Sequence, residues 1–165
     1  IKDTIPALIE AMEDREVTVR ASAAMALGNI GEATDDVLSA LVKGIRDTEW
    51  RVRDFCVTSL GKLGVVNDDI VHALIPCLFD DHELVTYSTV SALEDLKPNY
   101  PEVEEAMLKL ASSDDYVLRI SAADLTTLIG FRSPQIFEML NVLLEDEEED
   151  VRLSAKEAFN KISGI

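Results

Sequence analysis

The sequence predicts an all-α fold, a right-handed α-α superhelix (solenoid) of five two-helix repeats of 33 residues. Three observations predict it: a motif that recurs at constant spacing, a helical spacing of apolar residues, and a length of 165 residues, which five such repeats fill. The motif reads Val19-Arg20, Val52-Arg53, Val85-Thr86, Leu118-Arg119 and Val151-Arg152. A constant period in this range is typical of solenoids, in which each repeat packs on its neighbours.

We expect a single domain over residues 1–165, with repeats at 1–33, 34–66, 67–99, 100–132 and 133–165. Other positions obey the same period. One column is mostly acidic: Asp14, Asp47, Asp80, Ser113 and Asp146. Another holds small residues: Ala23, Cys56, Thr89, Ala122 and Ala155. Because no insertion breaks the register, residues 33 apart should occupy equivalent places in the fold.

Each repeat should contain two helices. In the first half of the first repeat, apolar residues are spaced by 3, 1 and 3: Ile5, Leu8, Ile9 and Met12. In its second half they are spaced by 4, 4 and 3: Val19, Ala23, Leu27 and Ile30. Both spacings place the apolar residues on one face of a helix. A short acidic turn separates the two halves.

Residues between the helices support these boundaries. Glycine follows the second helix at Gly31, Gly64 and Gly130. The pairs Asp35-Asp36 and Asp68-Asp69 are placed to cap the next helix, and Ser133-Pro134 reads as a cap followed by proline. The most irregular link is residues 97–101, Lys-Pro-Asn-Tyr-Pro. The helix before it should end ahead of Pro98, because proline disfavours helical backbone in the preceding residue.

The composition limits the partners. The formal net charge is −17, from 32 acidic and 15 basic residues, so the surface repels nucleic-acid backbones and anionic membranes. A basic or amphipathic protein partner is compatible with it. We find no apolar run long enough to span a membrane and no signal peptide. Cys56 and Cys77 fall at positions that we expect to be buried, which favours a reducing compartment. We therefore expect a cytoplasmic location. The chain starts at Ile1, so we expect that it is a piece of a longer protein.

The segment from Ala11 to Gly31, AMEDREVTVRASAAMALGNIG, resembles the HEAT-like repeat of phycobilisome lyases. The shared pattern is Asp14, Val19-Arg20, Ala23-Ala24, Ala26-Leu27-Gly28 and Ile30-Gly31. The third repeat departs most, with Thr86 in place of arginine and Glu94 and Lys97 in place of glycines. The resemblance implies that the first helices lie on the convex side and the second helices line the concave side. It also implies that the repeated Asp and Arg residues pair with each other and with neighbouring turns.

The resemblance also implies a groove along the second helices. Counted from the first residue of the Val-Arg motif, its lining lies at positions −2, −1, +2, +3 and +6. In the second to fourth repeats these positions hold a strip of apolar and aromatic residues with one arginine: Trp50, Arg51, Phe55, Leu84, Tyr87, Tyr116, Val117 and Ile120. Such a strip is costly in water unless something covers it, and Trp, Tyr and Arg are frequent interface anchors. We therefore predict that it binds a peptide or helix. The alternative is that curvature packs these residues against adjacent second helices.

Signals for chemistry are weak, and we expect no catalytic residue, metal or cofactor. Histidine occurs only at His72 and His82. Deoxyhypusine hydroxylase, a relative in architecture, holds iron with paired His-Glu motifs, whereas this chain has the single pair His82-Glu83. Alkylpurine DNA glycosylases line their groove with Lys and Arg, whereas Arg51 is the only basic residue in these columns. Cys56 lies in a column of small residues and is expected to be inert core.

The leading hypothesis is therefore a non-catalytic scaffold or adaptor that binds a protein segment in its groove. One alternative is a lyase-like or chaperone-like binder of a tetrapyrrole chromophore, and another is a structural spacer in a longer array. The acidic stretch 145–150 could dock a basic segment or could be a solvated turn. Ile1, Ile5 and Ile162 look uncapped, which allows self-association through the ends.

Overall fold

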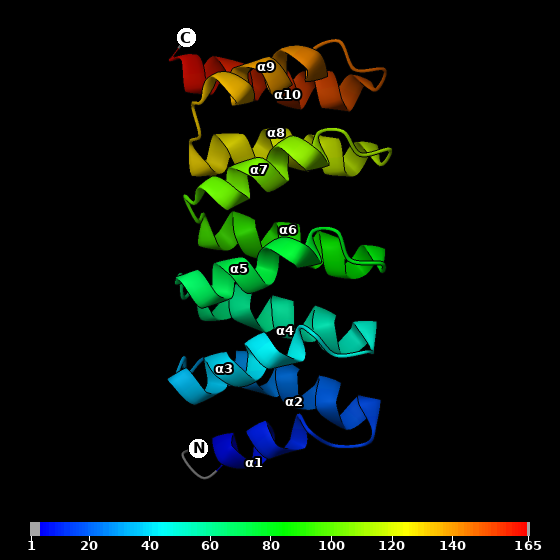
Figure 1. The fold of residues 1–165 in the computed structure, drawn as a ribbon, viewed down its shortest axis with the longest axis vertical. Coiled ribbons are helices and arrows are strands. Elements are labelled where there is room, and N and C mark those ends of the chain that lie inside the picture. Colours follow the sequence, from blue (N-terminus) through cyan, green and yellow to red (C-terminus); the bar gives the residue numbers. More distant parts are fainter. Residues whose placement is uncertain (1–3, 165) are drawn as a thin grey trace. The chain divides into compact units, whose positions relative to one another are not determined.

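The structure is a computed structural model that describes residues 4–164, and this range contains ten α-helices and no strand (Figure 1). The first helices of the repeats are α1 (Thr4–Ala11), α3 (Asp35–Gly44), α5 (Asp68–Cys77), α7 (Pro101–Leu110) and α9 (Pro134–Leu143). The second helices are α2 (Val17–Ile30), α4 (Trp50–Leu63), α6 (Glu83–Leu96), α8 (Tyr116–Ile129) and α10 (Glu149–Ser163). The predicted all-α fold of two-helix repeats is confirmed.

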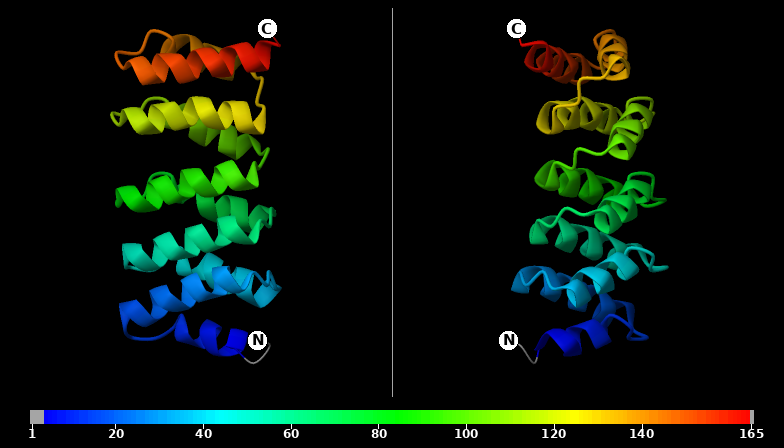
Figure 2. Two further views of the ribbon diagram at one scale, coloured as in Figure 1. Left: turned by 180° about the vertical axis from the view of Figure 1, so that it is seen from behind. Right: turned by 60° about the vertical axis from the view of Figure 1, so that its left-hand side comes forward.

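The chain divides into two compact units, Ile1–Leu96 and Lys97–Ile165. In the first unit, α2, α4 and α6 pack side by side as one layer, and α1, α3 and α5 form the other (Figure 2). In the second unit α8 packs on α10 and α7 on α9. The division falls at the irregular link 97–101. A single domain over residues 1–165 stays a prediction.

The repeated columns form the core. The first helices contribute Leu41, Leu74, Met107 and Leu140, all fully buried. The column of small residues is also buried, which lets neighbouring second helices approach closely. Val19 was expected in the core but is 38% exposed. It lies in the first turn of α2, and no earlier second helix among the described residues covers it.

Two expectations about the chain ends and the caps are corrected. Ile5 and Ile162 are buried within their own repeats, so neither presents an apolar end; Ile1 lies outside the described residues. The caps of α3 and α5 are Thr34 and Asn67, whose side chains accept from the N–H groups of Val37 and Ile70. The aspartate pairs instead lie in the first turns, where they complement the helix dipole. Ser133 caps α9 as predicted.

The repeated arginines and aspartates pair between consecutive repeats, as the resemblance implied. Three bidentate pairs are Arg20 with Asp47, Arg53 with Asp80, and Arg119 with Asp146, all at 2.7–2.9 Å. Each arginine also donates to two backbone carbonyls in the turn before its own helix. The series of Arg–Asp pairs lacks one member, because Thr86 stands in the arginine column and Ser113 in the aspartate column. These two residues lie on either side of the division between the compact units.

Candidate functional site

The predicted strip is accessible in the first compact unit. Five of its residues lie there, and we call them the first-unit strip: Trp50, Arg51 and Phe55 on α4, with Leu84 and Tyr87 on α6. Arg51 is exposed, Leu84 is 44% exposed, and the three aromatic residues are half-buried. Because α4 and α6 pack side by side, these side chains share one layer of second helices (Figure 2, left).

Trp50 has partners within the protein. Its ring stacks on the imidazole of His82, with centroids 3.9 Å apart and an angle of 9° between the planes. The guanidinium carbon of Arg51 lies 5.0 Å from the centroid of the indole, a cation–π distance. The His82 ring is held in the turn before α6, where its Nδ1 accepts from the N–H of Leu84 at 3.4 Å. One indole face is therefore used internally, a contact the sequence analysis missed.

A hydrogen bond between α4 and α6 lies among the residues of the same groove columns. The hydroxyl of Ser88 on α6 donates to the carboxylate of Asp54 on α4. Phe55 and Tyr87 are the sequence neighbours of this pair. The bond holds α4 and α6 in register at the position where the two aromatic side chains emerge.

The second compact unit presents a separate apolar surface, which we call the second-unit patch: Tyr116, Val117 and Ile120 on α8, with Leu153 on α10. Tyr116 is 44% exposed, Val117 38% and Leu153 57%, and Ile120 is half-buried. Leu153 occupies the position of Ile120 one repeat later and is the most exposed of the four.

Two residues in the columns that we expected to line the groove are buried. Ala21 is 5% exposed and Ser121 is 8% exposed. The hydroxyl of Ser121 turns back to the carbonyl of Val117 at 2.9 Å, so it points along its own helix. These two positions therefore offer no surface to a partner.

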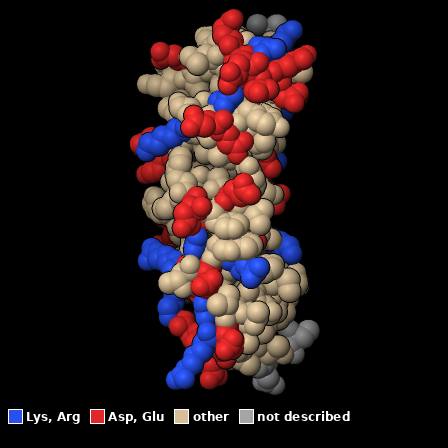
Figure 3. All heavy atoms as spheres, turned by 90° about the vertical axis from the view of Figure 1, so that its right-hand side faces the viewer, with Lys and Arg blue, Asp and Glu red and all other residues tan. Residues whose placement is uncertain are grey.

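Carboxylates gather near the second-unit patch. Glu149, Asp150 and Glu157 on α10 are exposed, and none forms an ion pair with a described residue. Figure 3 shows the acidic side chains grouped over the turn between α9 and α10. The two arginines of this region are engaged, since Arg119 holds Asp146 and Arg152 donates to the carbonyls of Asp146 and Glu147. Lys156 and Lys161, also on α10, are exposed.

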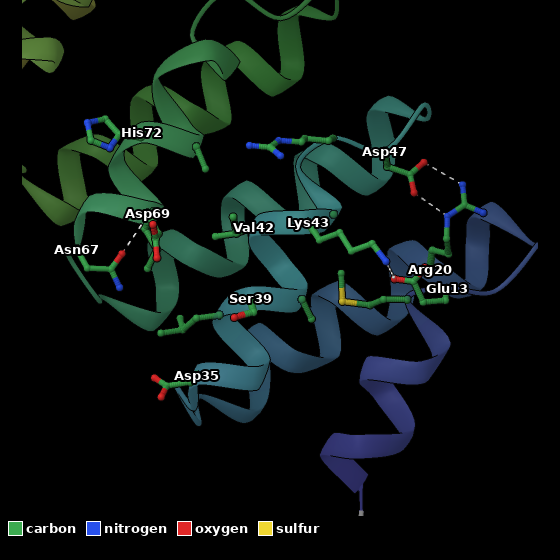
Figure 4. Close-up of a pocket in the computed structure, with 17 residues that line it drawn as sticks. Glu13, Arg20, Asp35, Ser39, Val42, Lys43, Asp47, Asn67, Asp69 and His72 are labelled. Carbon is green, nitrogen blue, oxygen red and sulfur yellow. Dashed lines mark hydrogen bonds and ion pairs between the residues drawn. The ribbon is translucent and has the colours of Figure 1, made fainter.

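A cavity of about 850 Å³ lies among the first helices of the first compact unit, which the sequence did not indicate. It runs over α3 toward α1 and α5 (Figure 4). The Lys43 ammonium on its wall lies 2.7 Å from Glu13, and Arg20 holds Asp47 beside it. These two ion pairs neutralise four of the charges that line the cavity.

Reactive groups are scarce among the described residues. No group of three or more His, Cys, Asp or Glu side chains there could hold a metal ion. Cys56 and Cys77 are buried, and burial raises both thiol pKa values, that of Cys77 to about 11. Both thiols are therefore protonated, and poor nucleophiles, at neutral pH. No helix in residues 4–164 has the length and apolarity needed to cross a membrane.

The profile of HEAT repeats matches residues 5–94 and again residues 38–126. The chain belongs to the HEAT repeat family. No curated protein matches this HEAT repeat chain. Its membership accounts for the two-helix repeat.

Solved structures resemble the HEAT repeat chain in fold. A chain from the CpcE–CpcF complex of phycocyanin lyase from Nostoc sp. PCC7120 has a TM-score of 0.78 at 20% identity, over 98% of this chain and 65% of that one. A computationally designed armadillo repeat protein for modular peptide recognition has a TM-score of 0.69 at 18% identity, and the match covers 96% of this chain and 82% of that one. An engineered protein has a TM-score of 0.68 at 22% identity, and the match covers 98% of this chain and 80% of that one. HEAT and armadillo repeats are typical of protein-interaction scaffolds.

Proposed function

We propose that this HEAT repeat chain is a non-catalytic adaptor that binds a peptide or helix of another protein through its second helices. The observation that carries the proposal is the exposure of apolar side chains on that layer in both compact units. Leu84 is 44% exposed in one, and Tyr116 and Leu153 are 44% and 57% exposed in the other. Exposed apolar patches of this kind mark interaction sites, and Trp, Tyr and Arg anchor many of them.

The first-unit strip has the makeup of an interface anchor. Arg51 lies over Trp50, and Trp50 lies on His82, so the aromatic surface is pre-ordered before a partner arrives. Ordering in the free protein lowers the entropic cost of binding. The likeness to an armadillo protein designed for modular peptide recognition agrees with a peptide partner, although that likeness is one of fold.

A pull-down with a matched control tests the proposal. The double variant Trp50→Ala, Tyr87→Ala removes two aromatic side chains from the first-unit strip. The control Phe79→Ala, Val142→Ala removes two apolar side chains that are 51% and 68% exposed outside the second-helix layer. Partners captured from a lysate of the source cells by wild type and by the control, but not by the first variant, support the proposal. Retention of every partner both by the strip variant and by the second-unit variant Val117→Ser, Leu153→Ser, with their helical circular dichroism intact, contradicts it.

A tetrapyrrole is the second candidate ligand, because a chain of the phycocyanin lyase complex shares the fold with a TM-score of 0.78. An aromatic surface suits such a chromophore, but its propionates need cations. Arg51 lies over Trp50, and the Lys62 ammonium donates to Asn29 at 3.1 Å, so the two nearby cations have partners. Mixing the chain with a bilin tests this function: an unchanged absorption spectrum removes it.

The third hypothesis is a structural spacer in a longer array. It predicts that flanking repeats cover the strip in the full-length protein. Hydrogen exchange and surface labelling of Trp50 and Tyr87 in the full-length chain would separate a covered strip from an open one. Self-association through the ends stays a prediction, and the burial of Ile5 and Ile162 gives it no support.

A further inference from the structure

We infer that the second-unit patch takes a basic amphipathic helix, one whose apolar face is flanked by Lys and Arg. The inference rests on the proposed function and names the chemistry of the partner at one of its two surfaces. It depends on three features of α8 and α10: an exposed apolar surface, an excess of carboxylates on the same face, and the engagement of the two neighbouring arginines.

The apolar surface extends across two helices. Val117 and Ile120 lie one turn apart on α8, and α8 packs side by side with α10, which carries Leu153. Leu153 is 57% exposed, although it occupies the position of the half-buried Ile120. An exposed leucine at the position that follows Ile120 by one repeat extends the apolar surface of α8 onto α10 and offers contacts to the i, i+3 and i+7 residues of a docking helix.

The carboxylates lie on the same face of α10 as Leu153. Glu149 and Glu157 are four residues before and after it, and Asp150 is three residues before, which is the spacing of neighbours on one helix surface. All three are exposed and have no ion-pair partner among the described residues. Asp124 on α8 differs, because it accepts a hydrogen bond from Ser154.

The nearest arginines cannot neutralise these carboxylates without giving up other bonds. Arg119 is held by both oxygens of Asp146 at 2.8 and 2.9 Å. Arg152 donates to the carbonyls of Asp146 and Glu147 at 2.6 and 2.9 Å. Of the four residues that lie three or four positions from Leu153, three are acidic and one, Lys156, is basic, so the apolar surface carries net negative charge. An acidic segment is repelled there, whereas Lys and Arg flanking an apolar face are attracted and steered into register.

The test uses a displayed library of helices selected on the whole chain. Each helix keeps leucine at three positions with i, i+3 and i+7 spacing, and its flanking positions vary among Lys, Gln and Glu. Lysine should be enriched at the flanks. A synthetic helix from the selection should bind wild type about tenfold more weakly when salt rises from about 0.05 to about 0.5 M, because salt screens exposed charges.

Two sets of variants locate the interaction. Glu149→Gln, Asp150→Asn, Glu157→Gln should weaken binding of the selected helix by about tenfold, since three rim charges are removed. The control Glu10→Gln, Glu32→Gln, Glu138→Gln removes the same charge from exposed positions outside the patch and should change binding by less than about twofold. Val117→Ser, Leu153→Ser should abolish binding. Thermal unfolding of each variant checks that it is folded.

Each outcome decides the inference. Enrichment of glutamine or glutamate, or equal weakening by the control triple variant, overturns the assignment of a basic partner. If Val117→Ser, Leu153→Ser still abolishes binding in that case, the proposed docking function stands. Failure to enrich any helix overturns the inference as well, and the pull-down with the first-unit strip variant then tests the proposed function independently.

Discussion

Arg119 and Asp146 join two consecutive repeats through a bidentate ion pair. Nε of Arg119 donates to Oδ2 of Asp146 at 2.8 Å, and Nη2 donates to Oδ1 at 2.9 Å. Nη1 donates to the carbonyls of Ser113 and Asp114 in the turn before α8. Both side chains are only 10% exposed. One guanidinium thus closes its own turn and fixes the turn of the next repeat.

Arg119→Met should lower the free energy of unfolding by about 2–4 kcal/mol, because Asp146 loses its partner in a largely buried place and two carbonyls lose a donor. Urea unfolding followed by circular dichroism measures the change. Arg132→Met removes the same charge at an exposed position and should stay within about 0.5 kcal/mol of wild type. A loss in Arg119→Met no larger than in this control would show that the pair does not stabilise the stack.

The same pair predicts a dependence of stability on pH. The hydrogen bonds from Arg119 hold the pKa of Asp146 below its usual value, which is about 3.9 in an unfolded chain. The folded pKa is thus the lower one, so the stabilising contribution is fully present above about pH 4 and disappears as the pH falls through the folded pKa. Asp146→Asn should therefore be destabilised most at neutral pH, and the difference from wild type should shrink toward pH ~2.

Unfolding of wild type and Asp146→Asn in urea at several pH values checks this expectation. Asp95→Asn, at an exposed position, controls for the loss of one negative charge. A difference between wild type and Asp146→Asn that is constant from neutral to acid pH contradicts the linkage.

The period of 33 residues predicted the helix pairs and the core columns, because equivalent positions in a stack make equivalent contacts, whereas the Asp–Arg pairs were expected from the resemblance to the HEAT-like repeat. The stacking of Trp50 on His82 was not predictable in this way. Residue 82 is one position away from the equivalent of Trp50, and neither residue recurs in the other repeats. The cavity over α3 depends on the spacing between first helices, which the sequence period does not set.

Lys97 occupies a place that three of the other repeats give to glycine. Its φ is +48°, in the left-handed region, as are those of Gly31, Gly64 and Gly130 at the equivalent positions. Lys97→Gly should stabilise the protein by about 1 kcal/mol, because glycine adopts this backbone without a Cβ clash. Lys97→Ala removes the same charge but keeps the Cβ, so it should raise the free energy of unfolding only slightly. Equal urea midpoints for the two variants would contradict the strain at this position.

The core and the first-unit strip should respond differently to truncation. Leu60 is fully buried, and Leu60→Ala should cost about 2–5 kcal/mol, since it removes core packing and leaves a cavity. Trp50→Ala, Tyr87→Ala removes more atoms, but both side chains are half-buried, so water replaces part of what is lost and no enclosed cavity is left; the stack of Trp50 on His82 adds about 0.5–1.5 kcal/mol beyond burial. Differential scanning calorimetry should show that Leu60→Ala lowers the melting temperature at least twice as much. Equal decreases would mean that the strip belongs to the core and is not available to a partner.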